Sequence, residues 1–192
     1  MSMLIAGVVI FFGSHLVRVV APGFRETMMQ RLGKWGWKGV YSVVSIVGLG
    51  LLIAGYVQAK PASDWLWSPP VWTRHLAALV VLPALVLLVA AYLPGRIRRA
   101  TGHPMTLAVV LWSGAHLLAN GQVADVILFG AFFLWSLVVL FSAMGRTANA
   151  GSDLSLPVGP LNDILAVVIG IGLWAWLAFG GHRVLFGMPV FG

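Results

Sequence analysis

Histidine is the chemically versatile residue that this sequence places repeatedly in or beside apolar segments. His15, His75, His103 and His116 occupy such positions, and only two carboxylates accompany them. An ionisable side chain within lipid is costly and usually marks a functional site. Imidazole nitrogens coordinate haem iron while the porphyrin edges pack against apolar side chains. Several histidines with few acids, amid Trp, Phe and Met, therefore favour axial ligation of a haem.

Arginine and aspartate supply the other charges near these segments. Arg18 follows His15 by three residues and shares its helical face. A buried guanidinium needs an anion, and a haem propionate, an aspartate or a lipid phosphate would each serve. Asp125 and Asp163 lie near the ends of apolar segments, which argues against proton-coupled transport through the middle of a bundle. Each single histidine can also be a hydrogen-bonded structural residue, so the haem interpretation depends on the set.

Several reaction classes are excluded by the residues that the chain lacks. Cysteine is absent, which removes disulfides, thiolate catalysis, iron–sulfur ligation and thiolate ligation of haem. The sequence contains neither a Gly-x-Ser-x-Gly elbow nor a phosphate-binding loop. Ser113 precedes His116 by one helical turn, but no acid close in sequence could orient that histidine as a hydrolase requires.

The composition indicates the elements that must position these side chains. Hydrophobic residues make up 60% of the 192 residues and charged residues only 9%, against about a quarter in soluble domains. Lipid must therefore solvate the surface, and nine Trp suit the headgroup zone. We predict an all-α, polytopic transmembrane helical bundle of about six spans, as one domain over residues 1–192. The expected spans are 3–20, 40–57, 72–93, 105–119, 123–144 and 161–179.

Basic residues predict the orientation of these spans. They gather in the connections 21–39, 94–104 and 145–160, whereas the connections between them carry little charge. Because basic connections stay in the cytoplasm, six spans put both termini in the periplasm, in a bacterial inner membrane. The first segment lacks a basic leader and a cleavage site, so we expect a retained span. The formal charge of +7 then reflects topology and anionic lipid headgroups, and we expect membrane lipids and no nucleic acid as partners.

Glycine is the remaining compositional signal. Glycines inside expected spans let helices approach closely, and they include Gly48, Gly50, Gly55, Gly170 and Gly172. Residues 148–160 form a polar Gly/Ser/Asn/Pro linker that we expect to be mobile.

Four segments carry a resemblance to a known family. They are Gly13–Arg18 followed by Ala21-Pro22, Trp37–Ser42, Pro70–Leu76, and His103–Gly121 with its His-Pro start and Trp-x-x-x-His. These segments, with Gly181-His182-Arg183, resemble the NnrU family of bacterial integral membrane proteins over nearly the full length. That family is similar in turn to the zeta-carotene isomerase, a membrane enzyme that uses haem b to isomerise a double bond.

The resemblance implies a cofactor and its ligands. The isomerase's haem-ligating histidines fall on His15 and His116. Arg18 and His103 are further candidates for contact with the cofactor. This chain has Ser113 where the isomerase has Cys, and adds His75. From helical depth alone, a His75–His116 pair is as good, so His75 is held as an alternative ligand.

The resemblance also implies a function. It suggests a haem b-binding protein with a redox or isomerase-like role on a hydrophobic or small-molecule substrate, linked to denitrification and nitric oxide metabolism. Respiratory and denitrification proteins would be its partners. Two alternatives stay open: a non-catalytic assembly or regulatory factor for a membrane reductase, and a membrane methyltransferase. The sequence assigns no catalytic residue.

Overall fold

The computed structural model describes residues 1–150 and 159–191, with the side chains of 146–150 left out. Within these ranges the chain is helical, and its only strand-like feature is an isolated bridge between Trp65 and Gln122. The predicted all-α class is therefore confirmed. Most of the linker predicted at 148–160 lies outside the described residues. The chain divides into two compact units, 1–67 with 121–131 and 68–120 with 132–192.

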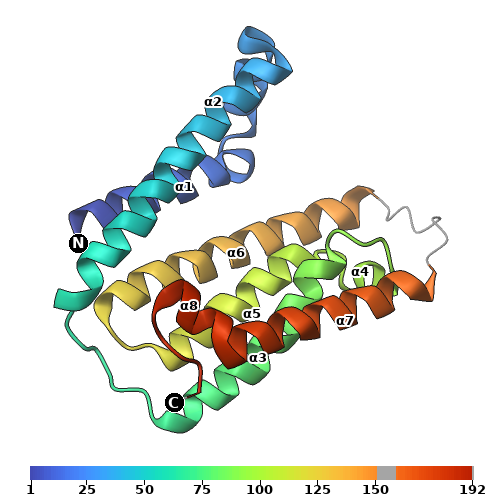
Figure 1. Cartoon of the computed structure of the whole chain (residues 1–192). Coiled ribbons are helices and arrows are strands. Elements are labelled where there is room, and N and C mark those ends of the chain that lie inside the picture. The colour runs from blue at the N-terminus through green and yellow to red at the C-terminus, as the bar shows by residue number, and fades with distance from the viewer. Residues whose placement is uncertain (151–158, 192) are drawn as a thin grey trace. The chain divides into compact units, whose positions relative to one another are not determined.

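The first unit is built on a helical hairpin. Helix α1 (Ser2–Val20) packs against α2 (Pro22–Ala59), as Figure 1 shows, and a short turn η1 (Lys60–Ala62) follows. The two backbones meet where Gly7 faces Leu52 and Gly48 faces Phe11, with no room for a Cβ atom. The close approach predicted from small residues therefore occurs at Gly48, whereas Gly50 faces open space.

The connection predicted at 21–39 is itself helical. Pro22 suits the first helical turn, and the Arg, Glu, Met, Gln and Lys residues after it have high helix propensity. The helix breaks at Gly33, whose φ of 72° is a left-handed conformation that other residues rarely adopt. α2 therefore has a polar arm before Gly33 and an apolar arm after it.

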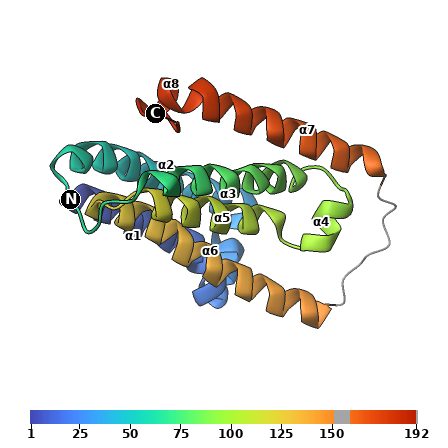
Figure 2. The ribbon, with the colours of Figure 1, turned by 90° about the horizontal axis from the view of Figure 1, so that it is seen from below.

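The second unit packs helices around α3 (Val71–Ala90). Helix α3 lies beside α5 (Pro104–Ala119) and α7 (Pro160–Trp176), as Figures 1 and 2 show. The connection between α3 and α5 forms the short helix α4 (Arg96–Thr101). A π-helical turn η2 (Leu177–Gly181) and α8 (His182–Phe186) follow α7.

Helix α6 (Val123–Ala150) begins in the first unit and continues in the second. Its second part contacts α5, where Trp112 meets Phe132 edge to face at 5.3 Å. Within α7, Gly170 abuts the backbone of Val86 in α3, and the Trp174 Nε1 donates to the Ala78 carbonyl at 2.7 Å.

Five of the described helical stretches are long and apolar enough to cross a membrane: Ser2–Val20, Pro22–Ala62, Val71–Ala90, Val123–Gly145 and Pro160–Phe186. Each of the six predicted spans falls on a helix, although the third continues three residues past the end of α3 at Ala90, and the fourth is the short one, as expected. With 16 residues, α5 is about 24 Å long, less than the roughly 30 Å of hydrocarbon. Large apolar side chains such as Ile46 (69% exposed) and Phe141 (66%) cover the outside of the helices. The chain is a polytopic helical membrane protein.

Candidate functional site

His15 lies on α1 and is held by its own helix. Its Nδ1 is 2.7 Å from the carbonyl oxygen of Phe11, one turn earlier. A carbonyl only accepts, so this contact places the proton on Nδ1 and the lone pair of the neutral ring on Nε2. The Phe11 ring lies 4.3 Å away and the Tyr41 ring of α2 lies 5.4 Å away. The half-buried imidazole is therefore fixed in one tautomer between aromatic rings.

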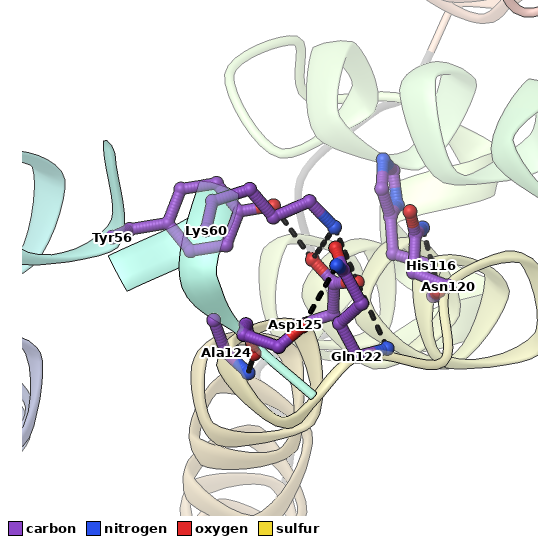
Figure 3. A network of polar contacts seen from close by, with 8 residues as sticks. Tyr56, Lys60, His116, Asn120, Gln122, Ala124 and Asp125 are labelled. Carbon is purple, nitrogen blue, oxygen red and sulfur yellow. Dashed lines mark hydrogen bonds and ion pairs between the residues drawn. The ribbon is translucent and has the colours of Figure 1, made fainter. Parts of the chain in front are cut away.

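His116 repeats this arrangement on α5. Its Nδ1 is 2.8 Å from the Trp112 carbonyl oxygen, again one turn earlier, and the Trp112 ring lies 4.8 Å from the imidazole. The Asn120 side chain donates to the His116 carbonyl at 2.9 Å and caps the end of the helix, as Figure 3 shows. This histidine is also half-buried and also carries its lone pair on Nε2. The ring nitrogen suited to a metal is therefore the same in both residues.

The other predicted site residues have different surroundings. Arg18 is exposed in the last turn of α1, where a cation suits the helix dipole. His75 is exposed near the start of α3 and stacks on Phe191, with ring centres 5.5 Å apart and planes 14° apart. His103 is half-buried and occupies the N-cap position of α5, without a side-chain hydrogen bond to the helix.

The predicted ligands belong to different units. His15 and Arg18 lie in the first unit, and His75, His103 and His116 lie in the second. The pairing of His15 with His116 stays a prediction, as does the alternative that uses His75. Among residues 1–150 and 159–191, no three His, Cys, Asp or Glu side chains gather as a metal cluster would.

A buried ion pair in the first unit was missed by the sequence analysis. Asp125, in the first turn of α6, is fully buried. The Lys60 Nζ donates to both of its carboxylate oxygens at 2.6 Å, and the Tyr56 hydroxyl donates to one at 2.7 Å. Figure 3 shows these groups converging on the carboxylate, which also accepts from the Gln122 backbone N–H at 3.2 Å. One sequence signal was available, since Lys60 is the lysine of an otherwise charge-poor connection.

Ser63 completes this junction. Its hydroxyl accepts from the Ala124 backbone N–H at 2.9 Å, and its carbonyl accepts from the Gln122 side chain at 3.0 Å. Two otherwise unsatisfied amides at the start of α6 are thus paired, by Ser63 and by Asp125. The network joins α2 to α6 and serves the architecture of the first unit.

Asp163 has a comparable structural task in the second unit. Its carboxylate accepts from the backbone N–H groups of Arg96 and Ile97 at 3.0 and 2.9 Å. It therefore caps α4 from α7, and the negative charge also suits the positive end of that helix. Asp125 and Asp163, each in the first turn of an apolar helix, are thus engaged in polar contacts that hold helices together.

The comparisons with known proteins identify the family. A sequence model described as NnrU protein matches residues 3–190, nearly the whole chain. The chain belongs to the NnrU family. A search of curated proteins and a search of solved structures each found no match. Membership in the NnrU family thus agrees with the resemblance that the four sequence segments indicated.

Proposed function

We propose that this NnrU protein binds haem b in the bacterial inner membrane, with His15 and His116 as the axial ligands. The observation that carries the proposal is the hydrogen bond that both imidazoles make to the backbone of their own helix. In each, the Nδ1–H donates to the carbonyl four residues earlier, at 2.7 and 2.8 Å. A second hydrogen bond of this kind orients a metal-ligating histidine and raises its basicity.

The surroundings of both histidines suit a porphyrin. Phe11 and Tyr41 flank His15, and Trp112 flanks His116, so each ring stands among aromatic side chains. Arg18 supplies a cation one turn from His15, where a propionate could be held. Bound haem b would supply a redox-active iron for a redox or isomerase-like role on a hydrophobic or small-molecule substrate. The family resemblance connects that role with denitrification and nitric oxide metabolism.

An absorption spectrum tests the proposal directly. Protein from haem-replete cells should show a Soret band, and pyridine haemochrome analysis should identify haem b. His15→Ala and His116→Ala should each lose most of the band. His182→Ala is the matched control, because its Nδ1 also contacts a carbonyl, that of Met188, at 2.7 Å. Wild type without a Soret band, or equal loss in the His182 variant, would overturn the proposal.

One further variant decides between the two ligand pairs. If His75→Ala removes the band while His15→Ala keeps it, the pair is His75 with His116, and the assignment of His15 is wrong. A haem-free protein that co-purifies with a reductase subunit would instead favour an assembly or regulatory factor. Binding of S-adenosylmethionine would favour the methyltransferase alternative.

The proposed orientation, with both termini in the periplasm, has its own test. It rests on the basic residues of the connections. Alkaline phosphatase fused to either end should be active, and green fluorescent protein fused to the same positions should be dark. The reverse result would refute this orientation without bearing on haem.

A further inference from the structure

The helical hairpin of the first unit contains an apolar groove of about 400 Å³. One wall comes from α1, from Val9 to Val17, and the other from α2, including Trp37, Tyr41 and Val44. At 1.5 Å per residue, the α1 wall is about 12 Å long. The groove therefore has the elongated, apolar character of a site for a hydrocarbon chain.

The break at Gly33 builds one end of this groove. In a continuous helix, Phe24 and Trp37 would be separated by about 20 Å along the axis. With Gly33 at a φ of 72°, the two rings instead meet edge to face with centres 6.2 Å apart. Both residues line the groove, so its end is formed by the polar arm of α2 folding back on the apolar arm.

Positive charge gathers at this same end. Arg25 adjoins Phe24, Lys38 adjoins Trp37, and Lys34 lies one helical turn before Lys38. Residues 18–38 carry five basic side chains against a single acid, Glu26. Among the side chains that the structure describes, none of Arg25, Lys34 and Lys38 forms an ion pair with a carboxylate.

The exposed aromatic residues indicate where this end lies. The Trp35 side chain is 78% exposed, and the Lys38 Nζ lies 4.9 Å from the centre of its ring. Exposed indole rings beside basic side chains are typical of the headgroup zone of a bilayer. The ligand that meets both features is an amphiphile with an apolar chain and a single anionic head.

We propose that this hairpin binds one anionic phospholipid, with an acyl chain in the groove and the phosphate against Arg25, Lys34 and Lys38. A soluble anion would leave the apolar groove unfilled. A lipid with no net charge would leave Arg25, Lys34 and Lys38 without a counter-charge. The groove adjoins the proposed haem ligand His15, because Tyr41 lines the groove and also flanks that histidine. The test therefore measures lipid retention and not haem content.

Native mass spectrometry of the full chain, released from detergent with equal amounts of phosphatidylglycerol and phosphatidylcholine, tests the charge requirement. Wild type should retain one phosphatidylglycerol in preference. The triple variant R25Q/K34Q/K38Q should lose about 100-fold in that preference, from three headgroup contacts. The control R96Q/R98Q/R99Q removes the same charge from α4 in the second unit and should keep the preference. Equal loss in both triples, or no loss in the first, would overturn the proposal.

Filling the groove tests the acyl-chain site. A Cβ atom on Gly13 meets open space, so Gly13→Phe should occupy the groove without displacing a helix and abolish lipid retention. Gly50→Phe is the control, because Gly50 also faces open space but does not line the groove. Val44→Trp fills the groove from the opposite wall, and it provides an independent test if Gly13→Phe does not fold. Full retention in both filled variants would refute the acyl-chain site.

Discussion

The buried ion pair between Lys60 and Asp125 makes the sharpest prediction about the stability of this protein. Replacing Lys60 by Met leaves the fully buried carboxylate with only two donors, the Tyr56 hydroxyl and the Gln122 backbone N–H. Removing one partner of a buried pair leaves an uncompensated charge and costs about 3–5 kcal/mol. We therefore expect Lys60→Met to lower the free energy of unfolding by about that amount.

Removing the other partner of the pair, by Asp125→Asn, should lower the free energy of unfolding by less. In Asp125→Asn the amide oxygen can still accept from Tyr56, and Lys60 is left without its partner. The Lys60 side chain is 25% exposed, so its flexible stem can carry the ammonium group to water. The expected loss is about 1–3 kcal/mol, the cost of an imperfectly satisfied polar group. The two single variants thus differ because their unpaired partners differ in access to solvent.

Reversible unfolding in mixed micelles, followed by helicity, measures both losses. A double variant, Lys60→Met with Asp125→Asn, should lose less than the two single losses combined, with a coupling of about 1–3 kcal/mol. Arg31→Met, at an exposed arginine without a described ion pair and outside the proposed phosphate contacts, should change stability by at most about 0.5 kcal/mol. Additive losses in the double variant, or a Lys60→Met loss as small as that of the control, would refute this reasoning.

Three further predictions concern the second unit, and each can be measured in the same unfolding assay. Gly170→Ala should destabilise the protein by about 1–3 kcal/mol, because the added methyl group meets the Val86 backbone. Gly172→Ala should be neutral or slightly stabilising, because Gly172 faces open space. Equal effects of the two substitutions would contradict the observed packing. Asp163→Ala should cost about 1 kcal/mol through loss of the cap on α4, and amide exchange should rise in the first turn of that helix. Trp174→Phe should cost about 1–3 kcal/mol, because the Ala78 carbonyl loses its 2.7 Å donor, and a neutral result would show that water replaces the indole.

The sequence predicted the helical class well because a membrane span is a local property. A run of apolar residues satisfies its own backbone hydrogen bonds as a helix, and lipid accepts its side chains whatever lies elsewhere in the chain. The predicted ends agree closely with the structure for the first span and α1, and for the fourth and α5. The polar arm of α2 was the least predictable part, because a basic, amphipathic segment at an interface lacks the apolar run that marks a span.

The candidate site was predictable only in part. Residue type identified His15 and His116, but the contact of each Nδ1 with a carbonyl is a matter of side-chain rotamer. Glycine composition predicted close helix contacts without saying which glycines make them. Gly48 and Gly50 are two residues apart on one helix, so they face in different directions, and only the partner helix distinguishes them.

By itself, then, the sequence determined that this chain is a helical membrane protein, which segments can span, and that it belongs to the NnrU family. The tertiary structure decided which charges are neutralised and which surfaces are open. Lys60 and Asp125 are 65 positions apart, and Phe24 meets Trp37 only because Gly33 reverses the chain between them. Contacts of this kind join residues that are far apart in the sequence. They depend on how the helices pack, which no local pattern of residues predicts.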